Sequence, residues 1–403
     1  MPKDSRVAMR FELEWSYKYH AAMFAGAEQY GQERGWMSSV DEYIADTLPA
    51  KRTGKVPYDG VLARADKRLA ERAARLDLPL VNVWFSSPVR DQLPGVFLDF
   101  AALGRMRAEH LLSRGLRRFA IVTAQGVRSD AIEASEFLAT IGKAGSPCVT
   151  TTIPMDFSAT LVKWRSTQQA LTQWMAQWEL PIGVVVFPDD ISRTVAQMCR
   201  ARSWRVPQDV AIIAGYNEET ICEYARPTFT SIEPHYHRIG FQAAALLDRL
   251  MSEKAKGRNR RSGKSKQETE REHILSPPQG LIVRESTDFF TSDNPEVAQA
   301  LAFIAANSHR PIRVGDVAEA VHLETRTLRR RFEKYLGRAV VDEIRRVRIE
   351  RAKRELAQSE MSLTEIAHRA GFLDAQRMYE VFVRELGVSP SEYRKQRQIN
   401  ESM

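Results

Sequence analysis

The chain contains few cysteines and no long apolar run. Its three cysteines, Cys148, Cys199 and Cys222, form no CxxC pair and are odd in number, so the sequence indicates neither a disulfide scaffold nor a zinc site. Reduced structural thiols are typical of the cytosol. No apolar run approaches the ~20 residues that a membrane span needs, and the opening stretch MPKDSRVAMRFELEW lacks the apolar core of a signal peptide. We therefore expect a cytoplasmic protein with no membrane partner.

The sequence also lacks the motifs of common enzyme classes. It has no GxGxxG after a strand, no phosphate-binding GxxxxGK loop, no HExxH and no GxSxG. Among its histidines, His20, His110, His235 and His237 show no metal-ligand spacing with carboxylates. The sequence therefore predicts no catalytic residue, no metal ion and no cofactor. An enzyme is still kept as the alternative to the non-catalytic function argued below. It would be an α/β enzyme that acts on a sugar or nucleotide and is fused to a nucleic-acid-binding tail, since α/β folds also host such enzymes.

Two features of the sequence are informative, namely its length and its net positive charge. Its 403 residues are many for a single core and favour two or three domains. The formal net charge is +8 and the isoelectric point is near 9.4. This charge balance favours an acidic partner.

The first two-thirds of the chain alternates strand-like and helix-like patterns. The predicted strands are 6–13, 59–65, 78–85, 95–100, 118–124, 181–190 and 209–217, and the clearest predicted helices are 20–35 and 103–116. Several of these strands are nearly continuous apolar runs, which is typical of strands buried on both faces. The alternation indicates two α/β lobes with parallel sheets and right-handed crossovers. We assign residues 1–287 to this domain and residues 288–403 to an all-α domain.

Residues 254–273, KAKGRNRRSGKSKQETEREH, interrupt the α/β pattern. They have no apolar periodicity and are crowded with charge. This composition predicts a mobile insertion or linker. A non-specific contact with phosphates is the alternative.

The stretch 325–337, TRTLRRRFEKYLG, predicts a helix with one apolar and one basic side. At 3.6 residues per turn, Leu328, Phe332, Tyr335 and Leu336 form a stripe that we expect to be buried. Arg326, Arg330 and Lys334 point the other way together with Glu333. Arg329 and Arg331 flank the stripe, and Gly337 stands where the helix ends. Taken alone, this pattern is more typical of a solvated surface helix than of a nucleic-acid contact.

The neighbouring sequence indicates that this helix belongs to a duplicated unit. Four residues match others 49 positions later, namely Val314, Asp316, Val317 and Ala318 with Leu363, Glu365, Ile366 and Ala367. Each copy predicts a short helix, a turn and a longer helix, which is the helix-turn-helix layout. Capping boxes of the form Ser-x-x-Glu start the helices after Ser362 and Ser389. A helix over 340–358 joins the copies and spans roughly 25–30 Å, which is close to the ~34 Å of one DNA turn.

The second helix of each copy is the predicted reading element. In this motif the N-terminal part of the second helix enters the major groove. The predicted DNA-binding residues are Thr325, Arg326, Thr327, Arg329 and Arg330 in the first copy, and Asp374, Gln376, Arg377 and Glu380 in the second. Arginine can bind guanine and glutamine can bind adenine, each through two hydrogen bonds. The expected partner is a double-stranded DNA operator that offers two successive major-groove sites.

Three motifs run through the tail: TRTLRRRFEKYLG, RIERAKREL and EIAHRAGFLDAQRMYEVFVRELGVSPSEYRK. In these motifs residues 295–397 resemble the C-terminal DNA-binding domain of AraC/XylS-type transcription regulators. The resemblance implies that Gly371 and Phe372 shape the second turn. It also implies structural roles for Pro390 and Tyr393.

A second resemblance lies in residues 205–251, RVPQDVAIIAGYNEETICEYARPTFTSIEPHYHRIGFQAAALLDRLM. This segment resembles the effector-binding domain of LacI/GalR regulators, which implies a two-lobed, periplasmic-binding-protein-like fold. Such folds bind ligands at the carboxyl ends of parallel strands, in the cleft between the lobes. The predicted effector-binding residues are Ser16, Tyr17, Asp130, Glu133, Asp189, Tyr216 and Asn217.

Two positions depart from the pattern of these regulators. Glu133 stands where the resemblance places a sugar-binding arginine, and Tyr216 stands where it places an aspartate, although a shift of one residue brings Asn217 there. An arginine and an aspartate are what hold adjacent sugar hydroxyls. The effector is therefore open between a different sugar, a cationic or aromatic molecule, and no ligand at all.

Together these patterns favour a ligand-responsive transcription regulator. Effector binding would close the two lobes and shift a homodimer between arrangements of its DNA-binding tails. The expected partners are the DNA operator, a small sugar-like effector and a second copy of the chain, with RNA polymerase as a further partner of such a regulator.

Overall fold

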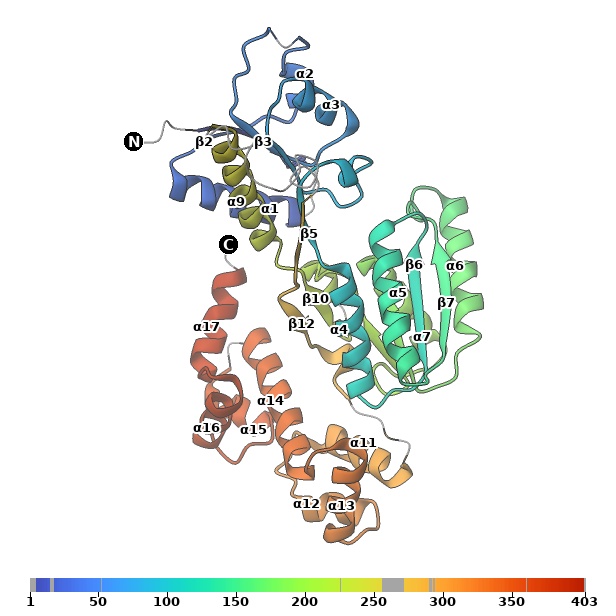
Figure 1. The fold of residues 1–403 in the computed structure, drawn as a ribbon. Coiled ribbons are helices and arrows are strands. Elements are labelled where there is room, and N and C mark those ends of the chain that lie inside the picture. Colours follow the sequence, from blue (N-terminus) through green and yellow to red (C-terminus); the bar gives the residue numbers. More distant parts are fainter. Residues whose placement is uncertain are drawn as a thin grey trace.

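The computed structural model describes residues 5–14, 18–51, 53–224, 226–255, 272–289, 292, 294–359 and 361–401. Three parts follow one another in Figure 1: an α/β lobe at the top, a second α/β lobe at the right and a helical domain at the bottom. The predicted effector residues Ser16 and Tyr17 lie outside the described residues. Most of the basic segment predicted over 254–273 also lies outside them.

A six-stranded parallel sheet forms the first lobe, in the order β11-β5-β4-β3-β1-β2. Its strands are β1 (Arg6–Arg10), β2 (Met37–Val40), β3 (Gly60–Ala63), β4 (Leu80–Asn82), β5 (Gly95–Leu98) and β11 (His273–Ser276). Val7 and Met9 of β1 pack with α1 (Lys18–Arg34) and α9 (Tyr236–Ala255). Ala8 between them packs on the opposite face with α2 (Ile44–Thr47) and α3 (Lys67–Arg75). Both faces of the sheet are therefore covered at its centre, which is why β3 and β5 contain apolar residues and glycine alone.

Two glycines let α1 and α9 lie in close contact. A Cβ atom at Gly26 would lie 1.9 Å from the carbonyl oxygen of His237, and one at Gly240 would lie 1.8 Å from that of Met23. Any other residue would push the helices apart. The contact fixes the start of α9, and with it Tyr236, at the boundary between the lobes.

A four-stranded parallel sheet forms the second lobe, in the order β7-β6-β8-β9. Its strands are β6 (Phe119–Ala124), β7 (Cys148–Ile153), β8 (Ile182–Val186) and β9 (Val210–Ile213). One face packs against α6 (Leu161–Met175) and α7 (Asp189–Ala201). The other face packs against α4 (Phe100–Ser113) and α5 (Arg128–Lys143).

Within the described residues, the chain crosses between the lobes three times. β5 leads into α4, β10 (Ser231–Glu233) leads into α9, and β11 leads into β12 (Gly280–Ile282), which pairs antiparallel with β10. The shorter helical elements are η1 (Arg90–Gln92), α8 (Glu219–Cys222) and η3 (Glu285–Thr287). This is the two-lobed α/β fold with parallel sheets that the sequence predicts.

The helical domain contains two cores that share one helix. Its helices are α11 (Pro295–Asn307), α12 (Val314–Ala320), α13 (Thr325–Leu336), α14 (Val340–Gln358), α15 (Leu363–Arg369), α16 (Ala375–Leu386) and α17 (Pro390–Glu401). The first core unites α11, α12 and α13 with the first half of α14, and the second unites the rest of α14 with α15, α16 and α17. Val347 belongs to the first core and Ile349 to the second. α14 therefore sets the distance between the two helix-turn-helix units.

Most sequence predictions about these elements are confirmed. All seven predicted strands are present, with ends that differ by a few residues. α12 and α15 begin at Val314 and Leu363, 49 residues apart, which confirms the repeat. α13 and α16 begin at Thr325 and Ala375, one residue further apart. Both capping boxes also form, after Ser362 and after Ser389.

Two kinds of prediction failed. Tyr335 was expected in the buried stripe of its helix, but it is 44% exposed. The buried stripe of α13 consists of Leu328 and Phe332, and Leu336 in the last turn is half-buried. Five strands were not predicted at all: β2, β7, β10, β11 and β12. β2 and β7 are rich in serine or threonine and lie at sheet edges, and the other three have only three or four residues.

Candidate functional site

α13 presents a basic face to solvent. Its exposed residues include Arg326, Arg329 and Arg330, and Thr325 and Thr327 are half-buried beside them. Leu328 and Phe332 are fully buried on the opposite side, and this burial fixes the rotation of the helix. Within the described part of the chain, the three arginines form no ion pair. The face therefore offers uncompensated guanidinium groups.

A hollow of about 490 Å³ lies beside this face. It is lined by Arg329, Arg330 and Glu333 of α13 and by Ala339 and Val340 at the start of α14. The Glu333 carboxylate and four apolar side chains, Val314, Ala339, Val340 and Val341, border the hollow beside the two guanidinium groups, so its surface is not uniformly basic.

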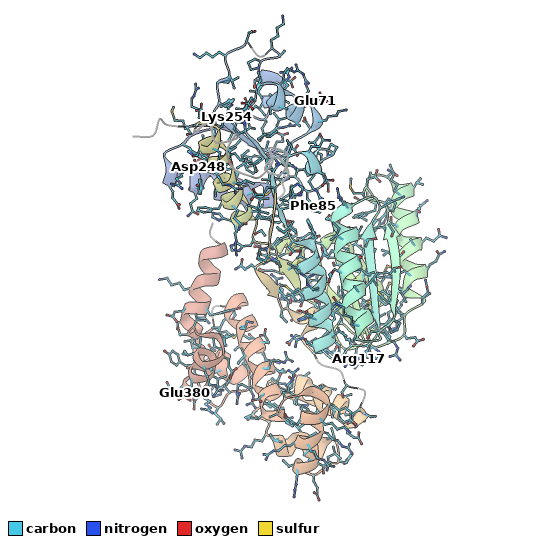
Figure 2. The ribbon with its side chains drawn as sticks, viewed as in Figure 1. Glu71, Phe85, Arg117, Asp248, Lys254 and Glu380 are labelled. Carbon is cyan, nitrogen blue, oxygen red and sulfur yellow. The ribbon has the colours of Figure 1, made fainter. Side chains whose placement is uncertain are left out.

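The matching face of α16 has a different composition. Asp374 caps the helix, and its carboxylate accepts a hydrogen bond from the backbone N–H of Arg377 at 2.7 Å. The side chain of Arg377 donates to Glu380 at 2.8 Å. Gln376 is exposed next to them, and Glu380 lies at the outer edge of the helical domain (Figure 2). Of the predicted residues here, three line the exposed face and Asp374 stabilises the helix start.

Two predicted carboxylates of the second lobe follow the ends of its strands. Asp189 starts α7 after β8, and its carboxylate accepts hydrogen bonds from the backbone N–H groups of Tyr216 and Glu218 at 3.2 and 3.3 Å. Asp130 follows β6 and accepts one from Ala124 at 3.0 Å. Burial raises the pKa of both carboxyl groups above the ordinary range. They lie at the edge where parallel-sheet folds bind ligands.

Glu133 and Tyr216 contact each other inside the second lobe. The hydroxyl of Tyr216 donates to Glu133 Oε2 at 2.9 Å, and Arg107 Nε donates to Glu133 Oε1 at 2.5 Å. Arg107 also donates to the carbonyl oxygens of Ala214 and Gly215 at the end of β9. Arg107 and Glu133 are fully buried. The charge at position 133 is therefore compensated by an arginine of α4 that sequence reasoning did not identify.

Asn217 is occupied by contacts at the crossovers. It is 2% exposed and adopts a left-handed conformation with φ of 57°. Its Nδ2 donates to Glu233 at 2.8 Å, and its Oδ1 accepts from Arg284 at 2.8 Å and from Ser231 at 3.2 Å. Its side chain thus ties β9 to the segments of β10 and β12.

At the carboxyl ends of its strands, the first lobe places three candidate effector-binding residues that the sequence prediction omitted. Arg64 donates from Nε to Glu12 at 2.8 Å, and its guanidinium lies over the ring of Trp84, 5.1 Å from the centroid. Glu12, Arg64 and Trp84 follow the carboxyl ends of β1, β3 and β4. The strand-end rule that selected Asp189 could also have selected them.

Aromatic rings bring the two lobes together. Tyr236, at the start of α9, packs on Tyr19 with 5.1 Å between ring centroids. Burial raises the pKa of Tyr236 well above the ordinary range, and the charges of Glu133 and Asp189 in the second lobe act in the same direction. Phe85, labelled between the two lobes in Figure 2, packs on Phe100 with 4.6 Å between ring centroids where β5 leads into α4. Tyr216 of the second lobe packs against the core of the first lobe, so side chains from both lobes meet along this boundary.

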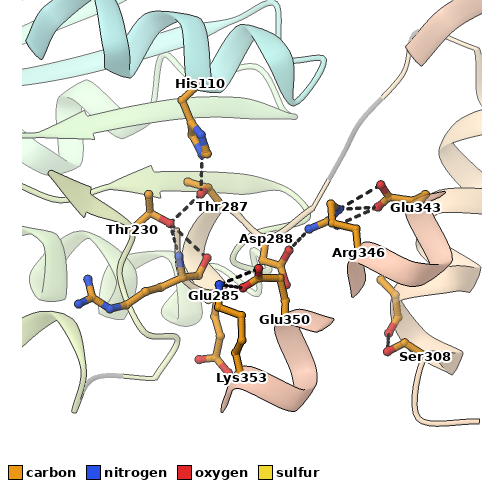
Figure 3. Close-up of polar contacts among 12 residues, drawn as sticks. His110, Thr230, Glu285, Thr287, Asp288, Ser308, Glu343, Arg346, Glu350 and Lys353 are labelled. Atoms are coloured by element: carbon orange, nitrogen blue, oxygen red, sulfur yellow. Dashed lines mark hydrogen bonds and ion pairs between the residues drawn. The ribbon is translucent and has the colours of Figure 1, made fainter. Parts of the chain in front are cut away.

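A charged cluster joins the second lobe to α14 (Figure 3). Asp288 accepts a hydrogen bond from Arg346, which also donates to Glu343 at 2.8 Å. His110 Nε2 lies 2.8 Å from the hydroxyl oxygen of Thr287, one residue before Asp288. Burial lowers the pKa of His110 to about 3, and the charges of neighbouring arginines act in the same direction. We call these five residues the junction cluster.

α4 belongs to both the lobe boundary and the junction cluster. Arg107 contacts Glu133 and the end of β9, and His110, three residues later on the same helix, contacts the segment that leads to the helical domain. A rigid helix therefore links the two regions.

Comparison with known proteins agrees with this architecture. Residues 108–287 match the family of periplasmic binding protein-like domains, and residues 317–396 match a helix-turn-helix domain family. The chain is thus a transcription regulator in which a periplasmic-binding-protein-like domain precedes an AraC-type helix-turn-helix domain.

Over nearly its whole length, the chain is similar to xylose operon regulatory proteins. It is 27% identical over 402 residues to that of Escherichia coli strain K12, covering 97% of each chain. It is 27% identical over 388 residues to that of Haemophilus influenzae, covering 93% of this chain and 95% of the relative. The structure of the xylose-binding transcription activator xylR matches with a TM-score of 0.60 and 24% identity over 98% of each chain, a likeness of fold.

Two further findings concern the described residues only. None of the helices described is long and apolar enough to span a membrane. No group of three or more histidine, cysteine, aspartate or glutamate side chains in this part of the chain is arranged to hold a metal ion.

Proposed function

We propose that the protein is a cytoplasmic, homodimeric transcription regulator whose DNA binding is controlled by a sugar held between the two α/β lobes. The observation that carries the proposal is a pair of outward-facing second helices, α13 and α16, held by one shared helix beside a two-lobed effector domain. In this role the protein performs no catalysis, and RNA polymerase is a further partner.

The chemistry at the lobe boundary supports a sugar. Sugar hydroxyls both donate and accept hydrogen bonds, and charged groups that bind in pairs hold them best. Arg64 and Glu12 offer this pair from the first lobe, and Asp189 offers a carboxylate from the second. Trp84 and Tyr216 add aromatic surface for the ring. In this proposal Arg64 takes the role of the arginine expected at position 133. Glu12 and Asp189 take the role of the aspartate expected at position 216.

Regulation then requires only a shift between an open and a closed arrangement of the two lobes. A sugar that binds the closed lobes more tightly than the open lobes moves the population toward the closed form. α4 contacts both the lobe boundary and the junction cluster, so closure changes the position of α14 and its two reading helices.

The DNA-binding half of the proposal is tested on α13. Arg326→Ala and Arg330→Ala should each weaken specific binding by roughly 1–3 kcal/mol if the side chain reads a base. Lys334→Ala removes the same charge at the far end of the helix and should weaken specific DNA binding less. Affinities are measured by gel-shift titration on a duplex selected from a random library. Equal affinity of all three variants and the parent protein would count against the proposal.

The effector half is tested by thermal shift with D-xylose and a panel of other pentoses and hexoses. A ligand at 100 times its Kd stabilises the folded protein by ~2.7 kcal/mol. Arg64→Met should abolish this shift, whereas Arg6→Met, which removes a half-buried arginine that pairs with Asp59 in the same lobe, should keep it. No shift with any sugar would refute the sugar and leave DNA binding intact. Turnover of a sugar or nucleotide would instead support the enzyme alternative.

A further inference from the structure

The two reading helices differ sharply in charge. α13 contains four arginines and one lysine against one glutamate, whereas α16 contains two arginines against two glutamates. At matching positions of the repeat, Arg326, Arg329 and Arg330 correspond to Gln376, Tyr379 and Glu380. The two copies therefore share the fold of the unit and differ at these outward-facing positions.

Ion pairing increases this difference. In α16, Arg377 pairs with Glu380 at 2.8 Å and Arg384 pairs with Glu385 at 3.0 Å. In the described part of α13, the one arginine with an ion pair is Arg331, which pairs with Glu296 on the half-buried side. A phosphate approaching α13 meets uncompensated guanidinium groups. A phosphate approaching α16 meets arginines that each have a glutamate partner.

α16 has an exposed apolar surface in place of charge. Tyr379 and Val383 are 48% and 38% exposed, and Leu373, just before the helix, is 68% exposed. Tyr379 and Val383 are four residues apart and so lie on one face, adjacent to Gln376. In the major groove, apolar side chains contact the thymine methyl group and glutamine binds adenine through two hydrogen bonds.

We infer that the two helices read different kinds of base pair. α13 binds phosphates and guanine through its arginines, and α16 reads A·T pairs through Gln376 on adenine and through Tyr379 and Val383 on thymine methyl groups. The operator therefore has two unlike boxes, one with guanine and one rich in A·T. This inference rests on the proposed function and adds the base specificity of each helix.

Selection from a randomised duplex library with the full-length protein tests the inference. We expect a bipartite motif whose boxes are about one helical turn apart, with guanine in one box and A·T pairs in the other. Arg326→Ala should relax the guanine box alone, and Gln376→Ala the A·T box alone. Two similar guanine-bearing boxes would overturn the inference. So would a single box that is insensitive to changes in α16, which would mean that its apolar face binds something other than DNA. A library with no enriched motif would instead refute the proposed function.

Salt dependence provides a second readout at one matched pair of positions. Arg329→Ala should lower the slope of log K against log salt by about 0.9 if this arginine contacts a phosphate. Tyr379→Ala should leave the slope unchanged and weaken binding to the selected duplex by roughly tenfold. Both residues are exposed, so both variants should keep the parental circular dichroism spectrum. A reversed pattern, with the slope lowered by the tyrosine change alone, would contradict the inference.

Discussion

Gly371 stands at a turn that no other residue can form without strain. Its φ is +76°, and a Cβ atom there would lie 2.1 Å from the carbonyl oxygen of Ser308 at the end of α11. The turn of the second helix-turn-helix unit therefore contacts the backbone beside the first unit. The family resemblance predicted a role for Gly371 in the turn but not this contact.

Gly371→Ala should lower the free energy of unfolding of the helical domain by ~2–4 kcal/mol. The alanine would be strained by the left-handed backbone conformation, and its Cβ atom would also clash with the carbonyl oxygen of Ser308. Gly387→Ala is the matched control, since φ is +73° but no atom lies within 4 Å of the added carbon. It should cost ~1–2 kcal/mol. All seven tryptophans precede residue 205, so fluorescence during urea unfolding reports the lobes. Circular dichroism reports the helices of the whole chain, and the part of its transition that fluorescence does not follow reports the helical domain. Equal losses in both variants would show that the clash is relieved.

His110 predicts a stability that depends on pH. Its pKa is about 3 in the folded protein against the ordinary 6.5, with burial as the main cause and the charges of Arg114 and Arg346 opposed only by Asp288. Between these values the unfolded chain binds more protons, so stability falls as pH falls below 6.5. From pH 7 to pH 5 this residue should cost ~2 kcal/mol. His110→Gln, measured by tryptophan fluorescence in urea, should remove that part of the loss. A variant with the parental pH dependence would contradict this assignment.

At the scale of elements, α14 combines two tasks. It contributes to both cores of the helical domain, and through Glu343 and Arg346 it joins that domain to the second lobe. A helix in this position transmits any movement of the lobe to both reading helices at once.

Arg346→Met should therefore destabilise the contact between the helical domain and the second lobe. Arg346 is largely buried with Asp288 and Glu343, and removing one partner from a buried ion pair costs ~3–5 kcal/mol. Arg345→Met is the control on the next residue, whose pairs with Asp342 and Glu385 lie at the surface and should be worth less than ~1 kcal/mol. In urea, the circular dichroism and fluorescence transitions should separate more widely in Arg346→Met than in Arg345→Met. An equal separation of the transitions in the two variants would show that the junction cluster does not couple the helical domain to the second lobe.

At the scale of the whole molecule, the net charge of +8 predicts DNA binding that weakens steeply with salt. A protein that contacts 6–10 phosphates loses roughly 10³–10⁵ in affinity between 50 and 200 mM salt. Replacing residues 256–271 with a neutral linker should leave this slope unchanged if the segment is a linker. Gel-shift titrations across the salt range measure both quantities. A lower slope in the linker variant would favour the alternative of a phosphate contact.

Local signals in the sequence determined much of this protein. Apolar runs predicted seven strands, Ser-x-x-Glu boxes predicted helix starts, and the repeat after Val314 predicted two helix-turn-helix units, because each signal depends on residues close together in the chain. The exposure of Arg326 and Gln376 followed from the same periodicity.

Only the tertiary structure decided which distant side chains meet. Arg107 pairs with Glu133, Arg64 reaches Glu12 and Trp84, and Arg346 of α14 reaches Asp288 at the end of η3. These pairings depend on which strands are neighbours and how helices cross the lobes, and a single sequence contains no periodic signal for either. The sequence could therefore indicate a reading helix and a cleft, but the compensation of charge within them required the folded chain.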